Sequence, residues 1–498
     1  MQRSERASQP EHVVVVGTGP CGAMAAAQLS RHGVAVTVLD AGRRVPRGLI
    51  VRAAGNTVFR WREKGLIDDD RHEIIDGHDV VWNSSRSLGG LSNYWTAAVP
   101  RFAPEDFTEG GAVDERFVWP VRYEDLVPYY ELAEHELCIT AGCGCGHLPA
   151  NVARYHTAPP DDWEQVAHGV RAAGAGLCPI PMAKGKPWMI AARGTEFSSY
   201  PCVLERHVEQ QRIRLIRGAI VTRLNWNSAT QRVDSVTYID RETNELVTMP
   251  ARAVVLAAGA VDSTMVLLRS VSSDFPDGLG NSNGLVGRYL HDHPREWWVG
   301  VPKRPMTALA HPLYIPRGQY DSAQALCASS LTLGLAHWSH RPRTWLRAKV
   351  DRFGVQVFGT MIPRPDTGVS LPSRPDVSDG YIRPTIVLRY DQPAMNTLSD
   401  ARERLVETLA LGSLEVSVPG PFHEVVPGSS VHFGGTIRMH DSPEHGALDR
   451  WNRLRDAPNV RVVDLSCFTT GPEKNPTLTA MALATRAAAH LAEELSAG

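Results

Sequence analysis

Long apolar runs and clusters of one charge are both missing from this 498-residue sequence. No stretch of about 18 consecutive apolar residues occurs, so no membrane-spanning helix is expected. Lysine and arginine (52) nearly balance aspartate and glutamate (54), and there is no basic tract, so no nucleic-acid partner is expected. The first 11 residues are polar and of mixed charge, unlike a secretory signal, and we therefore expect a cytoplasmic protein.

Cysteine is scarce, and its eight residues mostly stand alone, as in a reduced protein without a disulfide framework. One cluster, Cys143-Gly-Cys145-Gly-His147, contains residue types that ligate metals. It lacks the spacing of about two to four residues and the second ligand pair of a zinc site. We expect a glycine-rich loop at this position and no metal site.

The chain begins, by contrast, with a clear strand, glycine turn and helix. Val13 to Val16 form a continuous apolar run, as in a buried strand of a parallel sheet. An alanine-rich helical segment extends to Gly33, and a second strand, from Val34 to Leu39, ends at Asp40. Between the first strand and the helix lies the turn Gly17-Thr18-Gly19-Pro20-Cys21-Gly22. This order predicts a dinucleotide-binding unit.

The residue types in this unit suit a bound dinucleotide. Gly17 permits the tight turn, Gly19 lets the backbone approach a pyrophosphate, and Gly22 lets the helix pack closely on the strand. The N-terminus of the helix offers N–H groups and a positive dipole end to the phosphates. Asp40, 23 residues after Gly17, is placed to accept a hydrogen bond from an adenosine ribose hydroxyl. The motif extends to Ala26 and Gly33 as in FAD-binding proteins more than in NAD-binding ones.

Three later segments have the composition of loops or strand ends that line a ligand. The loop 86–102 combines adjacent glycines with small polar residues, which suits backbone passing close to a ligand. Residues 253–259 predict a second buried strand that ends in a small-residue turn, with a helix over 262–270. Residues 281–294 are polar, punctuated by glycine and rich in histidine.

The remaining pattern predicts helices and antiparallel strands. Helices are expected over 123–137, 161–173 and 398–411, the last with Ser399 or Asp400 as N-cap. Asn475 and Pro476 are expected as N-cap and first residue of a long C-terminal helix. A buried strand is expected over 459–464, and residues 43–80 are expected to be a loop-rich connection. Antiparallel strands are predicted at 212–216, 219–226, 232–239 and 246–249, and again at 296–300, 326–335, 355–362 and 382–390.

Six blocks, in order, resemble the glucose–methanol–choline (GMC) family of FAD-dependent oxidoreductases. They are the opening unit at 12–40, the Gly89-Gly90 loop, the strand 254–259, SNGLVGRYLHDHP at 282–294, HFGGTIRM at 432–439 and NVRVVDLS with NPTLTAM between 459 and 481. Residues 91–102 are most similar to the pyranose and glycoside oxidase branch. In some members of that branch a histidine before the tryptophan bonds covalently to the flavin, but Tyr94 stands here, so we expect non-covalent FAD. His440 follows Met439 where many members have glycine.

The resemblance implies a catalytic pair. His432 matches the family base that removes the hydroxyl proton while hydride passes to flavin N5, and a histidine suits that role. Asn475 matches the second member of the pair and can donate to the substrate oxygen, although it cannot act as a base. His293 is expected to support the flavin loop. The expected cofactor-binding residues are Gly17, Gly19, Pro20, Cys21, Gly22, Asp40, Ala41, Arg86, Gly89, Gly90, Ser92, Asn93, Tyr94, Trp95, Thr96, Val221, Ala258, Gly259, His293, Asp464, Asn475, Pro476 and Thr477.

The resemblance also implies an α/β fold with a Rossmann-like FAD-binding domain and an α+β substrate domain built on an antiparallel sheet. The FAD-binding domain is expected at 11–102, 205–295 and 430–498, and the substrate domain at 103–204 and 296–429. The expected activity is oxidation of a secondary hydroxyl of a sugar or glycoside to a keto-sugar, with oxygen or a quinone as electron acceptor. Tailoring of an aminosugar or another natural-product alcohol is the alternative, and a non-redox hydroxynitrile lyase is a remote one. The oligomeric state is not predicted.

Overall fold

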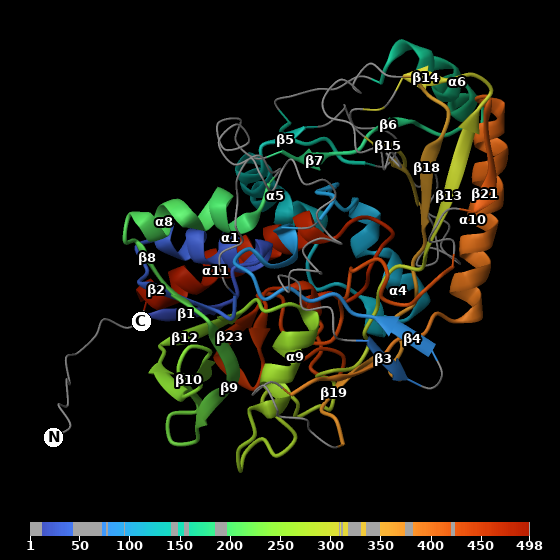
Figure 1. Cartoon of the computed structure of the whole chain (residues 1–498). Coiled ribbons are helices and arrows are strands. Elements are labelled where there is room, and N and C mark those ends of the chain that lie inside the picture. Colours follow the sequence, from blue (N-terminus) through green and yellow to red (C-terminus); the bar gives the residue numbers. More distant parts are fainter. Residues whose placement is uncertain are drawn as a thin grey trace.

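The computed structural model describes residues 12–42, 72–75, 78–93, 95–140, 148–153, 159–184, 197–307, 309, 312–316, 330–334, 349–373, 382–419 and 424–497. Within these residues two six-stranded sheets lie in separate parts of the molecule, with a smaller three-stranded sheet beside the first (Figure 1). The predicted α/β fold class is therefore confirmed.

The first sheet is mostly parallel and has the order β22-β23-β12-β1-β2-β8. Its strands are β1 (Val13–Val16), β2 (Val36–Asp40), β8 (Ile213–Arg217), β12 (Ala253–Leu256), β22 (Arg453–Leu454) and β23 (Ala457–Val462). Neighbours from β23 to β8 pair in parallel, and β22 pairs antiparallel at the edge. Every residue of β1, β2 and β12 is buried, as expected for parallel strands covered on both faces.

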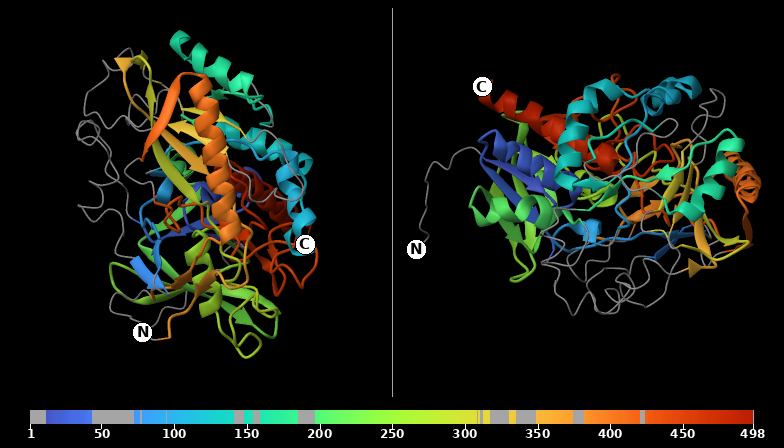
Figure 2. Two further views of the ribbon diagram at one scale, coloured as in Figure 1. Left: turned by 90° about the vertical axis from the view of Figure 1, so that its right-hand side faces the viewer. Right: turned by 90° about the horizontal axis from the view of Figure 1, so that it is seen from above.

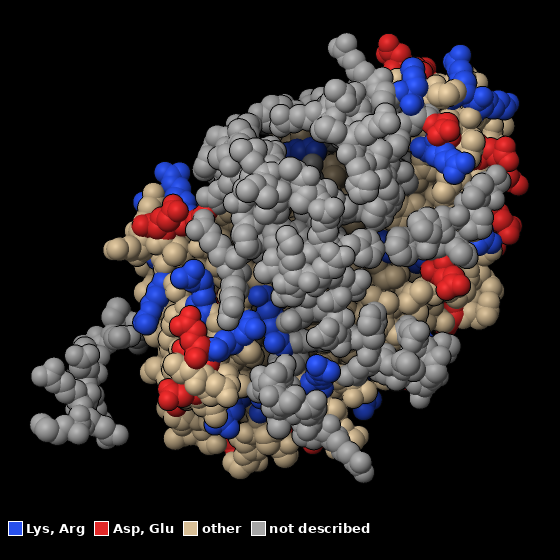
Figure 3. Space-filling view, viewed as in Figure 1, with Lys and Arg blue, Asp and Glu red and all other residues tan. Residues whose placement is uncertain are grey.

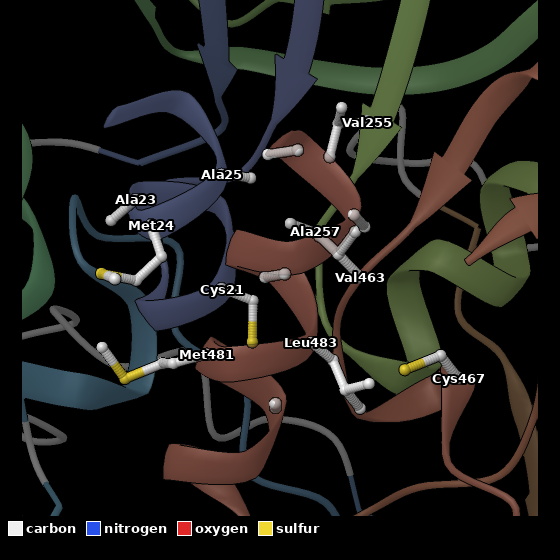
Figure 4. Close-up of a cluster of buried hydrophobic side chains, with 14 of the residues drawn as sticks. Cys21, Ala23, Met24, Ala25, Val255, Ala257, Val463, Cys467, Met481 and Leu483 are labelled. Carbon is white, nitrogen blue, oxygen red and sulfur yellow. The ribbon is translucent and has the colours of Figure 1, made fainter. Parts of the chain in front are cut away.

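Helix α1 (Pro20–Arg31) and helix α11 (Thr477–Ala497) pack against each other beside this sheet (Figure 1). Figure 4 shows Cys21 and Met24 of α1 close to Met481 and Leu483 of α11, and Val255 of β12 belongs to the same cluster. Alanines fill much of the same cluster, and their small side chains let the two helices approach closely. The two ends of the chain thus share one hydrophobic core.

The three-stranded sheet is antiparallel and consists of β9 (Ala219–Asn227), β10 (Arg232–Asp240) and β11 (Leu246–Pro250). Helix α9 (Ala260–Arg269) follows β12 and packs on β9. Further helices are α4 (Glu109–Val113), α5 (Tyr123–Leu137), α6 (Glu164–Ala172) and α8 (Glu205–Glu209).

The second large sheet is antiparallel throughout, in the order β21-β13-β18-β16-β15-β6. Its strands are β6 (Cys178–Pro179), β13 (Arg295–Pro302), β15 (Leu313–Ile315), β16 (Ser330–Gly334), β18 (Phe353–Phe358) and β21 (Leu414–Pro419). Helix α10 (Gln392–Leu411) covers one face, and Figure 2 shows it standing along the strands. Leu405 and Leu409 of α10 share a core cluster with Val355 and Val357 of β18.

Short two-stranded ladders complete the described secondary structure. They are β3 (His72–Ile75) with β4 (His78–Val81), β5 (Ile139–Thr140) with β7 (Met182–Ala183), β14 (Met306–Thr307) with β17 (Lys349–Val350), and β19 (Gly368–Ser370) with β20 (Thr385–Val387). In the described part of the chain no helix is both long and apolar enough to cross a membrane. On the described surface shown in Figure 3, basic and acidic side chains are interspersed.

Two predictions of local structure are wrong. Residues 212–216 do not join the small antiparallel sheet, because β8 pairs in parallel with β2. Of the predicted loop-rich connection 43–80, residues 43–71 and 76–77 lie outside the described residues, and β3 and β4 form a short ladder within 72–81. Helix α10 begins at Gln392 instead of residue 398, and its N-cap is Asp391, whose Oδ1 accepts from Ala394 N at 3.0 Å.

The start of α11 is shifted by one residue from the prediction. The helix begins at Thr477, and the carbonyl of Pro476 accepts the first helical hydrogen bond, from Ala480 N at 3.0 Å. Pro476 therefore holds the N-cap position predicted for Asn475, whose side chain instead reaches His432. The first sheet draws its strands from residues 13–40, 213–256 and 453–462, and the second from residues 178–419. The domain limits given above stay a prediction.

Candidate functional site

One cavity of about 600 Å³ runs from the glycine turn after β1 to His432 and Asn475. Its walls come from the carboxyl ends of β1, β2 and β12, the loop 82–96, the start of α11 and strands β13 and β18. Ligands of open parallel sheets bind at this edge of the strands. The predicted residues that line it are Gly17, Gly19, Pro20, Cys21, Asp40, Ala41, Arg86, Gly90, Ser92, Trp95, Thr96, Val221, Ala258, Gly259, His432, Asp464, Asn475 and Thr477.

Five predicted residues do not line this cavity: Gly22, Gly89, Asn93, His293 and Pro476. They lie behind residues that do, where they shape the backbone or hold a neighbouring side chain. Tyr94, on which the expectation of non-covalent FAD rests, lies outside the described residues, as does the Cys143 to His147 cluster. In the described part of the chain no group of histidine, cysteine, aspartate and glutamate side chains could hold a metal ion.

The glycine turn is closely packed on the protein side and open on the cavity side. Gly17 has φ +100°, and a Cβ there would lie 2.5 Å from the Ala257 carbonyl oxygen. A Cβ on Gly22 would lie 2.1 Å from the Gly17 carbonyl oxygen. Around Gly19, by contrast, a Cβ would meet no protein atom within 4 Å. The free space beside Gly19, at the N-terminus of α1, therefore fits an anionic group such as a pyrophosphate.

Asp40 binds the glycine turn as well as facing the cavity. Its Oδ2 accepts from the backbone N–H and the hydroxyl of Thr18, at 2.7 and 2.6 Å, and its Oδ1 accepts from Gly42 N at 2.7 Å. Burial raises the pKa of Asp40, while these hydrogen bonds oppose the shift. Thr18, whose hydroxyl also accepts from Gly89 N at 2.8 Å, was not among the predicted residues. Its position between Gly17 and Gly19 is the sequence feature that could have indicated this role.

The loop after β4 is held by short side chains that bond to backbone. Asn93 Nδ2 donates to the carbonyls of Leu88 and Gly90, and its Oδ1 accepts from Ser198. Gly89 has φ +94° and a Cβ there would lie 2.8 Å from the Ser198 hydroxyl. These contacts fix the path of Gly90, Ser92, Trp95 and Thr96 along the cavity wall.

Asp464 holds the turn after β12 in the middle of the cavity. Its Oδ2 accepts from Gly259 N at 3.0 Å and from the Ser263 hydroxyl, and its Oδ1 accepts from Ser466 N. Burial raises the pKa of Asp464, and the serine hydroxyls oppose that rise. The carboxylate thus joins the end of β23 to the start of α9.

His432, Asn475 and His293 form a linked group at the far end of the cavity. The Asn475 amide nitrogen lies 3.3 Å from His432 Nε2, and His432 Nδ1 lies 3.1 Å from His293 Nδ1. With the amide nitrogen donating to Nε2, neutral His432 carries its proton on Nδ1 and donates it to His293. The structure therefore brings the predicted pair together and places His293 behind it, instead of on the cavity wall.

The backbone of His432 is held by a buried carboxylate. Its N–H donates to Asp292 Oδ1 at 2.9 Å, and the Tyr390 hydroxyl donates to Asp292 Oδ2 at 3.3 Å. Burial raises the pKa of Asp292 to about 6. Burial, together with His293 and Arg295, holds the pKa of His432 well below its usual range, so its imidazole is neutral at neutral pH.

A buried ion cluster supports the segment before Asn475. The Lys474 ammonium lies 2.9 Å from a carboxylate oxygen of Asp106 and 2.9 Å from one of Glu473. Burial opposes the charge of Lys474, but the two carboxylates outweigh it and raise its pKa. This cluster fixes the residue next to Asn475 to the turn at Pro104–Phe107.

Sequence reasoning missed the wall opposite the glycine turn. Arg295 and Trp297 of β13, and Gln356 and Phe358 of β18, line the cavity, and the Phe358 ring stacks on His432 with centroids 6.4 Å apart. These residues belong to no sequence motif, because the local sequence around them indicates only that they lie on strands. His440, left open by the sequence, does not line the cavity, and its Nε2 lies 3.0 Å from the Glu115 carbonyl.

Comparison with family models gives two matches, both described as GMC oxidoreductase. One covers residues 13–295, which is more than half of the chain, and the other covers residues 378–484. The matched ranges contain the glycine turn, the loop 82–96, His432 and Asn475.

Two curated relatives and one solved structure resemble the chain over nearly its whole length. Paromamine 6′-oxidase of Streptomyces fradiae is 28% identical, with 97% of this chain and 91% of that protein covered. 6‴-Hydroxyparomomycin C oxidase of Streptomyces lividus is 29% identical, with 97% and 92% covered. A structure of formate oxidase from Aspergillus oryzae superposes with a TM-score of 0.70 and 17% identity, covering 99% of this chain and all of that one, which shows the shared fold.

Proposed function

This chain belongs to the GMC oxidoreductase family, and from that premise we propose that it oxidises a hydroxyl of a sugar or glycoside, with His432 as base and Asn475 as oxygen-binding partner. Enzymes of this family are FAD-dependent oxidoreductases that act on CH–OH donors. The observation that carries the residue roles is the 3.3 Å contact between Asn475 Nδ2 and His432 Nε2 on the cavity wall.

The cavity fits FAD. The open side of Gly19 at the N-terminus of α1 suits the pyrophosphate, and the carboxylate of Asp40 at the end of β2 suits the adenosine ribose. Ala258, Gly259 and Thr477 would contact the middle and far parts of the cofactor. When bound, FAD supplies the two-electron acceptor for the hydride that leaves the carbinol carbon.

The protein's part in the reaction is to take one proton and orient one oxygen. Without substrate, the Asn475 amide donates to the Nε2 lone pair of neutral His432. A substrate hydroxyl would take the place of this contact, donating to Nε2 and accepting from the Asn475 amide. As His432 takes the proton, its Nδ1–H stays bonded to the Nδ1 of His293, which holds the orientation of the ring. Phe358, whose ring centre lies 6.4 Å from that of His432, places an apolar group beside the imidazole.

A second candidate substrate is an aminosugar, because both Streptomyces relatives carry names of aminoglycoside substrates. Their names also place the reaction at a 6-type position, which in a hexopyranose is the exocyclic carbinol and not a ring hydroxyl. The choice between a ring hydroxyl, giving a keto-sugar, and the exocyclic hydroxyl, giving an aldehyde, is part of the proposal to be tested.

Anaerobic stopped-flow mixing of the FAD-loaded enzyme with neutral, acidic and amino glycosides tests the function. At least one class is expected to bleach the flavin, and mass spectrometry of the product then distinguishes keto-sugar from aldehyde. Reoxidation of the reduced enzyme by oxygen or by a quinone identifies the electron acceptor. If no sugar or glycoside bleaches the flavin, the proposed function is wrong.

A further inference from the structure

The wall of the cavity beside His432 is one face of the second sheet. In the antiparallel register of β13 and β18, Arg295 lies opposite Phe358 and Trp297 lies opposite Gln356. Side chains two apart on a strand point to the same face, so these four side chains share a face, and all of them line the cavity. The opposite face packs against α10. This wall is therefore built to contact whatever ligand reaches His432.

Arg295 is the charged side chain of this wall. Its Nη2 donates to the Ser429 carbonyl at 2.9 Å, and its guanidinium lies 6.0 Å from the centre of the Phe358 ring. Within the described residues no carboxylate lies within 4.0 Å of it, and its Nε and Nη1 make no hydrogen bond. A partly buried guanidinium without a direct ion pair is stabilised further when a ligand supplies an anion beside it.

Among the described residues, the neighbouring acidic groups do not form a direct ion pair with Arg295. Asp292 acts on it through space, while its own oxygens accept from His432 N and the Tyr390 hydroxyl. Glu296, next in sequence, faces the other side of the strand and pairs with Arg402 at 2.8 Å. The described carboxylates that line the cavity, Asp40, Asp262 and Asp464, belong to the first sheet and α9.

We propose that Arg295 is a specificity-determining residue that binds an anionic group of the substrate, so that the enzyme acts on an acidic sugar or glycoside. This inference rests on the proposed function and names its substrate class. The guanidinium fork matches a carboxylate or a phosphate with two parallel hydrogen bonds, one of which comes from Nη2. Arg295 uses only one of the two Nη2 hydrogens for Ser429, so the other can form such a pair together with Nε–H or Nη1–H. The same charge repels a protonated aminosugar, so Arg295 separates the two candidate substrate classes.

Binding can be measured without turnover in the FAD-loaded His432→Ala variant, which lacks the proposed base. Isothermal titration calorimetry compares four methyl glycosides of one ring configuration: the neutral sugar, its uronate, its 6-phosphate and its 2-amino form. The gluco, galacto and manno series are each tested. We expect an acidic form to bind at least about tenfold tighter than the neutral form, and the amino form to bind most weakly. Comparison of uronate with phosphate identifies the anion.

Adding Arg295→Gln to that background should abolish the preference for the acidic form and leave the dissociation constant of the neutral form within about threefold. Arg295→Lys should restore part of the preference, because it keeps the charge and loses the fork. Arg364→Gln is the matched control, since Arg364 pairs with Asp366 on the surface and does not line the cavity. The Arg364→Gln variant should leave the dissociation constants of all four glycosides unchanged.

Two results would overturn the inference while leaving the proposed function intact. One is the absence of any acidic preference in all three series. The other is an Arg295→Gln variant that alters the flavin absorbance or reduction potential and leaves the ligand order unchanged, which would assign Arg295 to the cofactor. Failure of every sugar to bleach the wild-type flavin, in contrast, contradicts the proposed function and is a separate measurement.

Discussion

At the scale of single residues, the facing nitrogens of His432 and His293 determine what the proposed base can do. Two Nδ1 atoms 3.1 Å apart share one proton, so the tautomer of each ring depends on the other. His293 also hydrogen bonds to the backbone of Pro472, and burial lowers its pKa to about 4. His293 therefore stays neutral and accepts from His432, leaving Nε2 of His432 free of a proton on the cavity side.

Replacing the proposed base tests this assignment directly. His432→Ala should retain bound FAD, because the glycine turn and Asp40 are untouched, and should reduce the rate constant for flavin reduction by about 10²- to 10⁴-fold. Stopped-flow absorbance with a saturating substrate measures the change. The parallel variant His440→Ala should reduce flavin at close to the wild-type rate, because His440 does not line the cavity. A near wild-type rate in His432→Ala would show that the base is elsewhere.

The pH dependence of the same step follows from the lowered pKa of His432. The base must be unprotonated to act, and its folded-state pKa lies well below 6.5 because of burial, His293 and Arg295. The rate constant for flavin reduction should thus be constant from about pH 8 to about pH 6.5 and fall only below that range. Arg295→Gln removes one cause of the shift and should move the fall to higher pH. A tenfold loss per unit that starts above pH 7 in the wild type would contradict this account.

The residues of the site differ in how well they could be predicted. His432, Asn475 and the glycines stand in dense, ordered motifs, because backbone turns and a catalytic pair restrict the residue types that fit. Arg295, Trp297, Gln356 and Phe358 lie on ordinary strands, and only the register of β13 with β18 brings them together. Register is a property of the assembled sheet, so the local sequence did not reveal this wall.

At the scale of helices and strands, the glycine turn shows two different needs for glycine. Gly22→Ala should disrupt folding, because its Cβ would lie 2.1 Å from the Gly17 carbonyl oxygen, between strand and helix. Gly19→Ala has ordinary φ and an open side, so the FAD-free protein should melt at the wild-type temperature. Its Cβ would instead occupy the proposed pyrophosphate space and weaken FAD binding. Flavin content after purification and melting of FAD-free protein separate the two effects, and normal flavin content in Gly19→Ala would contradict the pyrophosphate position.

The ion cluster before α11 gives a prediction about stability. Lys474→Met leaves the carboxylates of Asp106 and Glu473 buried without their cation, which should lower the free energy of unfolding by about 3–5 kcal/mol. Lys349→Met is the matched control, because Lys349 pairs with Asp162 at an exposed position and should cost about 0–1 kcal/mol. Urea unfolding followed by tryptophan fluorescence compares the two. Equal losses of unfolding free energy in the two variants would show that the Lys474 cluster stabilises the fold no more than an exposed ion pair does.

Elements were predicted well where local signals and burial agree, as in β1, α1 and β12. The predictions are wrong where an element is determined by a contact with residues far away in the sequence. The strand at 213–217 has a half-exposed edge pattern that suits either kind of sheet, and its parallel partner β2 lies more than 170 residues earlier. The predicted start of α10 lies too far along the chain, because Asp391 as capping residue and Pro393 in the first turn mark an earlier start than the apolar pattern does.

At the scale of the whole molecule, the cavity joins the two ends of the chain. Its lining includes Gly17 to Cys21 near the N-terminus and Asn475 and Thr477 near the C-terminus, with β13 and β18 from the middle. The core beneath it is likewise shared by α1 and α11. A ligand that fills the cavity therefore contacts both large sheets at once, and its binding is coupled to the folding of the entire chain.

FAD should accordingly stabilise the protein as a whole and not one part of it. A ligand that binds only the folded state adds stability according to its free concentration, about 2.7 kcal/mol when that concentration is about 100 times its dissociation constant. We expect the FAD-free protein to melt at a lower temperature, and the melting temperature to rise steadily as FAD is added. Circular dichroism should follow the helices, and tryptophan fluorescence should follow the packing of Trp95 and Trp119 in the core of the first sheet and of Trp163 in the core of the second. Because the cavity draws on both sheets, both signals should shift together. If FAD raised the transition of one signal alone, the two sheets would unfold independently, and the cofactor would stabilise only the sheet that holds its adenosine half.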